Sequence, residues 1–458
     1  MSYRKKIKIF FKSRPALKKI AKETRKWIYG VFNWAYPLLK SSTVSQIRQL
    51  DRKCQPFILT RHDLGCWLHT LHYANVWRNF RGDVVVFVLS SYWKEIQLIT
   101  KLLFPDLPMI CAGNRYTSLL RYIFGHFCLQ TQTLNPIYGA IRSFRLDSIV
   151  LFDMPMELEW PSKSPYHYQT DPYLDQRAIL PANFIEAYKN FRSYSQHRHD
   201  YFVDYGNIVY QDNPHPISDQ IRRSLSSLKS QLHFEEPYAI LNVNCKEYFD
   251  PILDRRSIHF PERFEVVIDE LVSKGYHVVL QGREEQPLYK KRKMFVDYAR
   301  SPRRSLENDT ALYSGCSLIV SSKTGPEVFG TIFDKPTIGC NYVEPSGLTP
   351  TKKLRYFPKI IRNLKTGKLL TWEEYYFHPS FFNFGKIHFD TNEEHQYLDM
   401  TEEELYQSIR EFLPLVGQPQ EMWDAYSKLQ QEFKSSLTRL HLGAFACRGV
   451  PLDTYLKR

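Results

Sequence analysis

The stretch SLIVSSKTGPEVFGTIFDKPTIGCN, residues 317–341, contains the pattern that decides the fold. Its apolar start (317–322) predicts a strand, PEVFGTIF (326–333) predicts a helix, and PTIGCN (336–341) predicts a second strand. Pro326 suits the first helical position, where no amide hydrogen is needed. Apolar strands that alternate with helices indicate a parallel sheet covered on both faces.

The same alternation runs through two sections of the chain. In the first, we expect strands at 56–60, 83–91, 109–113 and 148–153, and helices at 66–79, 93–104 and 114–127. In the second, we expect further strands at 238–244 and 276–282, and helices at 261–275 and 306–315. The fold prediction is therefore α/β, with two Rossmann-like, doubly wound parallel-sheet domains that face a cleft.

This pattern divides the chain into four predicted segments. We expect a basic amphipathic helical arm at 1–50, the two domains at 51–235 and 236–400, and helices at 401–458 that pack across both domains. The final segment begins with a capping-box sequence, TEEE, at 401–404. Residues 154–235 are rich in Pro, Tyr, His and Asn, so we expect an elaborated linker with one helix near 175–195.

Composition narrows the class of protein. The 458 residues are 43% hydrophobic and 15% aromatic, which is enough for packed cores and argues against disorder of the whole chain. No run of about 18 apolar residues indicates a transmembrane helix. The eight scattered cysteines form no C-x-x-C pair and suggest reduced thiols in a cytoplasmic protein, and no clear secretory signal follows the basic N-terminus.

The positive charge is concentrated at the N-terminus. Residues 1–40 contain twelve Lys or Arg and one acid, so they carry +11 of the net charge of +14. Apolar residues recur at roughly helical spacing after Ala16, with Phe10, Phe11 and Trp27 interleaved among the cations. This pattern favours a helix lying on an anionic membrane surface. A solvated or packing helix, or contact with nucleic acid, remains open.

Polar residues fill the turn after the strand at 317–322. Ser321 and Ser322 end the strand, Lys323 and Thr324 add a cation and a hydroxyl, and Gly325 lets a ligand approach the backbone. The amides and dipole of the following helix start favour a phosphate. An ordinary capped helix without a ligand is the alternative. Glu327 could accept hydrogen bonds from sugar hydroxyls, or simply favour the helix start by its charge.

Other strand ends carry further candidates. Gln281, Gly282 and Arg283 follow one strand, and Arg283 with Lys323 could surround one diphosphate, although a surface arginine is the alternative. Polar residues follow another strand: Asn242, Asn244, Lys246, Arg255 and Arg256. We expect one of these basic groups to face the cleft and the others to be solvated.

A possible base lies in the first section. The strand–loop–helix turn at 59–71 contains Arg61, His62, Asp63 and Gly65. His62 or Asp63 at a cleft could deprotonate an acceptor hydroxyl, although adjacent side chains need not point the same way.

The sequence lacks the motifs that are typical of several other classes of enzyme. The histidines of HRHD (197–200) fit a solvated loop better than a metal site, and no D-x-D motif stands at a strand end. G-x-G-x-x-G after a strand and G-x-S-x-G are absent, which argues against a nicotinamide dehydrogenase and a serine hydrolase. We therefore expect no metal and no cofactor.

Residues 238–380 resemble a bacterial family of GT-B glycosyltransferases associated with surface polysaccharide and lipopolysaccharide synthesis. The resemblance rests on GCSLIVSSKTGPEVFGTIFDKPTIGCN, the preceding YHVVLQG and the following RNLKTGKLLTWEEYY. It implies a nucleotide-sugar co-substrate in the domain at 236–400 and an acceptor in the domain at 51–235. By motif match, the resemblance implies that the nucleotide sugar contacts these residues: Ser321, Ser322, Thr324, Gly325, Glu327, Gly282 and Arg283. Lys246 stands where relatives tend to have an Arg-Glu pair.

The resemblance implies metal-independent transfer of a sugar to a glycan or lipid-linked acceptor. The basic arm would hold such an enzyme at the inner face of the cell membrane, and nucleic acid is the less favoured partner. A catalytically inactive nucleotide-sugar binder, or an adaptor that uses the arm, is the alternative function.

Overall fold

The computed structural model describes residues 55–59, 64–81, 84–88, 92–111, 215–245, 257–282, 286–322, 324–342, 353–372, 374, 395–439 and 450–457. The chain divides into two compact units, one formed by 1–62, 77–97 and 107–189, the other by 63–76, 98–106 and 190–458. Several expectations lie outside the described residues: the arm at 1–50, the helix at 114–127, the strand at 148–153 and the helix near 175–195.

The first unit contains a three-stranded parallel sheet in the order β1-β2-β3. Its strands are Gln55–Leu59, Val84–Val88 and Met109–Cys111. The helices α4 (Leu64–Arg81) and α5 (Trp93–Leu103) follow the first two, but residues 64–76 of α4 and 98–103 of α5 belong to the second unit. Consecutive residues of β2, Val84, Val85 and Val86, are all buried. Burial on both faces explains the continuous β-branched run of this strand and confirms the predicted alternation here.

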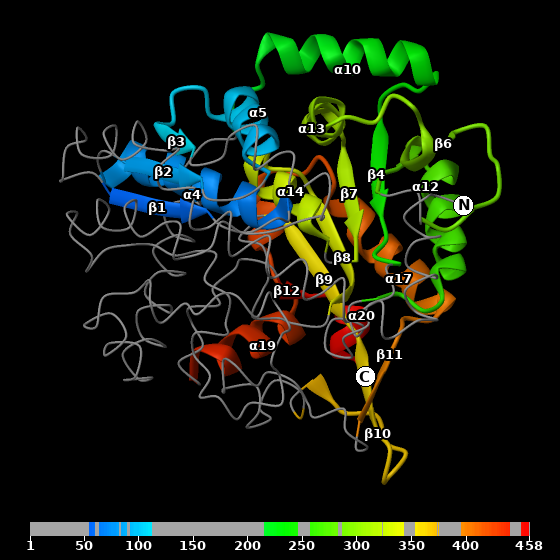
Figure 1. The fold of residues 1–458 in the computed structure, drawn as a ribbon. Coiled ribbons are helices and arrows are strands. Elements are labelled where there is room, and N and C mark those ends of the chain that lie inside the picture. Colours follow the sequence, from blue (N-terminus) through cyan, green and yellow to red (C-terminus); the bar gives the residue numbers. More distant parts are fainter. Residues whose placement is uncertain are drawn as a thin grey trace, which may run out of the picture. The chain divides into compact units, whose positions relative to one another are not determined.

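The second unit contains a seven-stranded sheet in the order β12-β9-β8-β7-β4-β5-β6, and every recorded pairing is parallel (Figure 1). The strands are β4 (Tyr238–Asn242), β5 (His277–Leu280), β6 (Phe295–Asp297), β7 (Leu318–Ser321), β8 (Thr337–Tyr342), β9 (Leu354–Pro358) and β12 (Val450–Pro451). The strands β10 (Ile360–Asn363) and β11 (His395–Leu398) pair antiparallel beside it. The α/β prediction with parallel sheets is confirmed.

Helices connect these strands. The α-helices are α10 (Asp219–Leu232), α12 (Glu265–Ser273), α13 (Leu306–Gly315), α14 (Val328–Ile332), α17 (Glu402–Phe412), α18 (Gln420–Asp424), α19 (Lys428–Arg439) and α20 (Asp453–Leu456). Short 3-10 helices are η5 (Pro261–Phe264), η6 (Tyr298–Arg300), η7 (Gly325–Glu327) and η9 (Leu413–Leu415). Gly275 follows α12 with φ of 84°, as its predicted place at a helix end requires.

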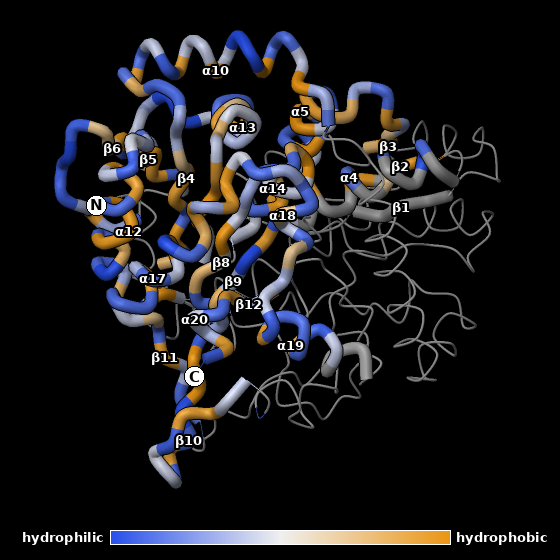
Figure 2. The backbone as a smooth tube through the Cα atoms, turned by 180° about the vertical axis from the view of Figure 1, so that it is seen from behind, coloured by the Kyte–Doolittle hydropathy of each residue, from blue (hydrophilic) through white to orange (hydrophobic). Residues whose placement is uncertain are grey.

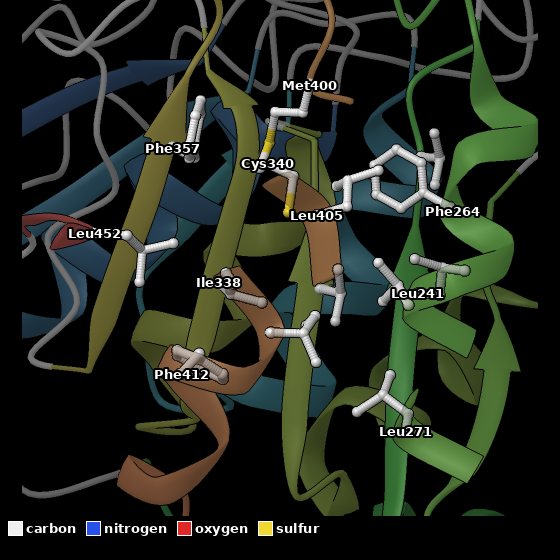
Figure 3. Close-up of a cluster of buried hydrophobic side chains, with 14 of the residues drawn as sticks. Leu241, Phe264, Leu271, Ile338, Cys340, Phe357, Met400, Leu405, Phe412 and Leu452 are labelled. Carbon is white, nitrogen blue, oxygen red and sulfur yellow. The ribbon is translucent and has the colours of Figure 1, made fainter. Parts of the chain in front are cut away.

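One large cluster of buried hydrophobic side chains in the second unit lies on one face of the sheet (Figure 3). Alternate strand residues such as Leu241 and Ile338 point to this face, because successive side chains of a strand point to opposite sides. Phe264, Leu271 and Leu405, from the segments η5, α12 and α17, pack against them.

The opposite face carries the other strand residues and the helices α10, α13 and α14. The hydroxyl of Tyr238 in β4 donates to the carbonyl of Leu312 in α13 at 2.7 Å. Tyr313 of α13 stacks on Phe329 of α14, with ring centroids 4.9 Å apart. Helices on both faces therefore give the doubly wound arrangement that the sequence predicts for this unit.

One helix was missed in the sequence. Residues 219–232 form α10, although the whole of 154–235 reads as linker. Only Ile221 and Leu228 of this helix are buried, so its apolar stripe is narrow, and hydrophilic residues predominate along α10 in Figure 2. Ser218 caps its start through the amide of Ile221, and His233 ends it in the left-handed conformation.

The described residues of the C-terminal segment contain helices, as predicted, but in several pieces, and their packing across both domains stays a prediction. Thr401 and Glu404 form the predicted capping box, with each side chain bonded to the other residue's amide. Pro414 lies in η9, and Pro419 lies directly before α18. These prolines explain the interruptions, because proline has no amide hydrogen for a continuing helix.

Candidate functional site

The chain adds strands to opposite sides of the seven-stranded sheet, and the point of reversal lies between the neighbouring parallel strands β4 and β7. From β4 the chain builds β5 and β6 on one side, and it later returns to build β7, β8 and β9 on the other. Asn242 and Ser321 are register partners at the carboxyl ends of β4 and β7. In doubly wound sheets, ligands bind beyond the strand ends at this point of reversal. The turn that the sequence singles out is therefore located at the topological switch point.

Ser322 ties the two central strand ends together. Its amide donates to the carbonyl of Asn242 at 3.1 Å, and its hydroxyl accepts from the amide of Asn244 at 2.6 Å. The Ser322 side chain is buried. This serine therefore fixes the spacing of the two segments that frame the switch point.

A hydrogen-bond network around the buried carboxylate of Glu327 stabilises the turn. The Ser321 hydroxyl donates to Glu327 Oε2 at 3.1 Å, and the Tyr342 hydroxyl donates to the same oxygen at 2.7 Å. Ser321 Oγ also lies 3.2 Å from the Thr324 hydroxyl. Ser321 and Glu327 are buried, and two hydroxyl donors stabilise the carboxylate there. The network holds the residues on either side of the turn in a fixed arrangement.

The turn itself is half-exposed at Thr324, Gly325 and Pro326. Thr324 has an extended backbone, with φ of −107° and ψ of 155°, which is typical of the residue before a helix. No described residue accepts a hydrogen bond from the Gly325 amide, and Pro326 has no amide hydrogen. The Gly325 amide therefore has no acceptor among the described residues at the start of the helical segment that continues through α14.

The start of α4 lies directly against this turn. Gly65 belongs to the second unit, and a Cβ atom on it would lie 2.7 Å from Gly325 Cα. A Cβ atom on Gly325 would lie 2.8 Å from the Gly65 nitrogen. Both positions therefore require glycine, because the obstructing atoms belong to the backbone. The first turn of α4 and the helix start at 325 approach more closely than any side chain would allow.

Gln281 and Gly282 follow β5 beside the switch point. Gln281 is buried, and its Oε1 accepts from the Asn242 amide group and, at 3.0 Å, from the Tyr313 hydroxyl. Gly282 has φ of 144°, and a Cβ atom there would meet the Gln286 side chain. Gln281 therefore links β4, β5 and α13 beneath the switch point, and Gly282 is required by its backbone conformation.

A perturbed carboxyl group adjoins this polar layer. Asp309 Oδ1 in α13 accepts from the Tyr298 hydroxyl at 2.9 Å. Burial raises the pKa of Asp309 to about 6, although the hydrogen bond from Tyr298 and the nearby Arg304 cation act in the opposite direction. This group can change protonation state between acidic and neutral pH.

Several of the predicted site residues lie outside the described residues, among them Arg61, Arg255 and Arg256 and the five that carry the proposed roles. These five are His62, Asp63, Lys246, Arg283 and Lys323. Among the described ones, the structure brings Ser321, Ser322, Thr324, Gly325 and Glu327 together at one turn, and it connects Gln281 to that turn through Asn242.

Sequence reasoning missed Tyr313 and Tyr342. Tyr342 comes from the end of β8 and reaches Glu327 fifteen positions earlier in the chain, and Tyr313 comes from the middle of α13. The sequence around each tyrosine does not indicate a role at the site, because only the tertiary arrangement brings their hydroxyls to Gln281 and Glu327.

No group of three or more His, Cys, Asp or Glu residues in the described part of the chain is arranged to hold a metal ion. No helix among the described residues is both long and apolar enough to cross a membrane. The histidines at 197–200 lie outside the described residues.

Four described cysteines, Cys111, Cys245, Cys316 and Cys340, are free thiols, as expected. Burial raises the pKa of the last three to about 12, so these thiols remain protonated at neutral pH.

No family model and no curated protein matches the sequence. Solved structures similar to it include the glycosyl transferase family 9 protein from Veillonella parvula DSM 2008, which is 13% identical with a TM-score of 0.42, over 80% of this chain and 99% of that one. The ADP-heptose lps heptosyltransferase II of E. coli is 13% identical with a TM-score of 0.35, over 66% of this chain and 90% of that one.

The UDP-GlcNAc 2-epimerase of Methanocaldococcus jannaschii is a further similar structure. It is 11% identical with a TM-score of 0.33, over 67% of this chain and 89% of that one. The similar structures thus include two glycosyltransferases and a sugar-nucleotide epimerase. Identities and TM-scores this low do not assign an activity to the chain.

Proposed function

We propose that this chain is a metal-independent glycosyltransferase of the GT-B type, which moves a sugar from a nucleotide-sugar donor to a glycan or lipid-linked acceptor. The observation that carries the proposal is the position of the Thr324–Gly325 turn at the topological switch point. Doubly wound sheets bind nucleotides at this place, and a helix start with a glycine suits their diphosphate. The motif resemblance of residues 238–380 supports a sugar nucleotide as the ligand.

In the proposed reaction, the acceptor hydroxyl attacks the anomeric carbon of the donor sugar. The bond between that carbon and the diphosphate oxygen breaks, and the nucleoside diphosphate leaves. The Gly325 amide, Arg283 and Lys246 or Lys323 stabilise the negative charge that develops on the leaving group. His62 or Asp63 takes the proton of the acceptor hydroxyl. Glu327 would accept a hydrogen bond from a hydroxyl of the donor sugar, in addition to those from Ser321 and Tyr342.

Cations would take the place of a divalent metal in this scheme. The sequence has no D-x-D motif at a strand end, which is the pattern expected where a metal ion holds a nucleotide diphosphate. The basic arm at 1–40 would keep the enzyme at the inner face of the cell membrane, close to a lipid-linked acceptor. Co-sedimentation with anionic vesicles should fall when the arm is removed, and a loss of binding to nucleic acid alone would contradict this placement.

One observation favours a second candidate, a catalytically inactive nucleotide-sugar binder. The side chains of Ser321, Ser322 and Glu327 already have hydrogen-bond partners inside the protein. A turn stabilised in this way can serve structure without chemistry.

A screen for nucleotide-sugar hydrolysis and transfer distinguishes the two candidates. Turnover by the full chain supports the transferase, whereas a nucleotide that raises the melting temperature without turnover supports the inactive binder. We expect His62→Ala or Asp63→Asn, whichever removes the base, to lower turnover by about 10²–10⁴-fold. Lys323→Ala should lower it by about 10²–10³-fold, by analogy with the loss of one charge-stabilising donor.

Lys291→Ala is the control, because Lys291 is exposed in the segment between β5 and β6. Unchanged turnover in the Lys323 and His62 variants would remove both residues from the site. Failure of every nucleotide to bind would refute both candidates.

A further inference from the structure

The β10 strand ends in a rigid, exposed turn. All six residues from Leu364 to Leu369 are exposed. The Asn363 side chain accepts hydrogen bonds from the amides of Lys365 and Thr366 at 2.9 and 3.0 Å, and Gly367 returns the chain with φ of 70°. The Gly367 amide donates to the Asn363 carbonyl at 2.8 Å. The turn therefore keeps its shape without being covered by the protein.

The turn combines hydrophobic and cationic side chains. Leu364 and Leu369 expose 50% and 43% of their surface, and Arg362, Lys365 and Lys368 are exposed around them. No Asp or Glu occurs between residues 354 and 372. Figure 2 shows both hydrophobic and hydrophilic segments at the β10 hairpin, and Figure 1 shows the hairpin extending from the seven-stranded sheet.

We propose that the turn Leu364–Leu369 docks on the surface of an anionic lipid bilayer. The two leucines enter the boundary between headgroups and acyl chains, while the cations meet the lipid phosphates. A lipid surface accepts both kinds of side chain at once. Single-stranded nucleic acid would neutralise the cations but would leave the leucines exposed, and the turn contains no aromatic side chain on which a base could stack. The inference is independent of the proposed sugar transfer.

A second basic segment provides the matched control. Leu288 is 81% exposed, and Lys290, Lys291 and Lys293 follow it. It is a single leucine, however, and the acids Glu265 and Asp269 form ion pairs with Arg292 in the same segment. The Leu288 segment therefore has greater exposure at one residue but lacks the two exposed leucines of the β10 turn, and its arginine is already paired with acids.

Hydrogen exchange of the full chain, measured by mass spectrometry, tests the proposal directly. The protein is compared in buffer, on phosphatidylcholine vesicles and on mixed phosphatidylcholine–phosphatidylglycerol vesicles. We expect slower exchange of the amides at 363–369 on the mixed vesicles only. Protection confined to residues 1–40 would leave the basic arm as a membrane contact and would refute the docking of the turn. Failure of sugar transfer would leave this result unaffected.

Two double variants test the contributions separately. Leu364→Ser with Leu369→Ser, and Arg362→Gln with Lys368→Gln, should each lower the partition coefficient on mixed vesicles by about tenfold. Leu288→Ser should leave it unchanged. The proposal is overturned if either double variant binds as the wild type does, or if Leu288→Ser loses as much. Protection by an oligonucleotide or an acidic protein, without protection by vesicles, would also overturn it.

Discussion

The backbone of Gly65 packs directly on the backbone of Gly325, at a separation that a single Cβ atom on either residue would violate. The contact joins the first turn of α4 to the turn after β7 inside the second unit. Two segments separated by 260 positions in the chain are thereby held at the switch point of the sheet. The first prediction concerns this contact.

Replacing both glycines should cost little more than replacing one. Gly65→Ala and Gly325→Ala each insert a methyl group against backbone, which should lower the free energy of unfolding by about 1–3 kcal/mol. Once one methyl group has separated the two segments, the second methyl group has more room, so it lowers the free energy of unfolding by less. Urea unfolding of the four proteins of the double-mutant cycle should therefore show strong non-additivity.

Gly65→Ala combined with Gly417→Ala is the control cycle. A Cβ atom on Gly417 would meet nothing within 4 Å, so its cost comes from the backbone φ of 81° alone. The two costs in the control cycle should add. Additive costs in the Gly65–Gly325 cycle would mean that the two glycines do not share one gap.

The switch point could be predicted from the sequence to a useful extent, because its information is local. The run from Ser321 to Gly325 follows an apolar strand and precedes a helix, and both features can be read in a short window. From the sequence, Gly65 could be recognised only as one residue of the polar turn at 59–71, not as a packing contact. Its partner could not be predicted, because the approach of α4 to residue 325 depends on tertiary packing rather than on any pattern near either glycine.

The buried ion pair between Lys359 and Asp399 leads to the second prediction. Their side chains are 0% and 1% exposed, with Nζ and Oδ1 2.7 Å apart. Asp399 also accepts from the amides of His259 and Phe260, at 2.6 and 3.1 Å. Lys359→Met would leave the carboxylate buried without its cation, so we expect a loss of about 3–5 kcal/mol in the free energy of unfolding.

An exposed ion pair is the matched control. Lys428 and Glu432 are 3.9 Å apart, with side chains 91% and 54% exposed. Lys428→Met should change the free energy of unfolding, measured in urea, by less than about 1 kcal/mol. A small loss in Lys359→Met, comparable to this control, would show that the buried pair contributes little to the native state.

This ion pair also shows where sequence reasoning fails. Lys359 follows β9 and Asp399 follows β11, and nothing near either residue indicates that it is buried. Isolated charged residues are usually exposed, so a sequence gives no reason to join these two. Likewise, the narrow apolar stripe of α10 left a real helix looking like linker.

Asp309 leads to a prediction on pH dependence. Its pKa is raised to about 6 by burial, so the native state holds a proton more tightly than the unfolded chain does. The resulting stability is present below about pH 4 and is lost as the pH rises through about 6, by an amount on the order of 3 kcal/mol. Asp309→Asn should therefore be more stable than the wild type near neutral pH, with little difference in mild acid.

Urea unfolding across this pH range provides the measurement. Tyr298→Phe is informative as a second variant, because the lost hydrogen bond should raise the pKa of Asp309 further and extend the loss to higher pH. If the wild type and Asp309→Asn showed parallel curves, Asp309 would not titrate differently in the folded protein.

Thr324 allows the most direct test of the central claim, that a nucleotide diphosphate binds at the switch point. Thr324 stands directly before η7 with an extended backbone, a position that both Asp and Asn favour, so either substitution should preserve the fold. The carboxylate of Thr324→Asp would repel a diphosphate, whereas the neutral amide of Thr324→Asn would not.

The measurement is the melting temperature of the full chain with a panel of nucleoside diphosphates. We predict that one nucleotide raises it in the wild type and in Thr324→Asn, since a ligand that binds the native state stabilises it. The rise should disappear in Thr324→Asp, although that protein melts no lower without nucleotide. An equal rise in all three proteins, or none in any, would contradict binding at this turn.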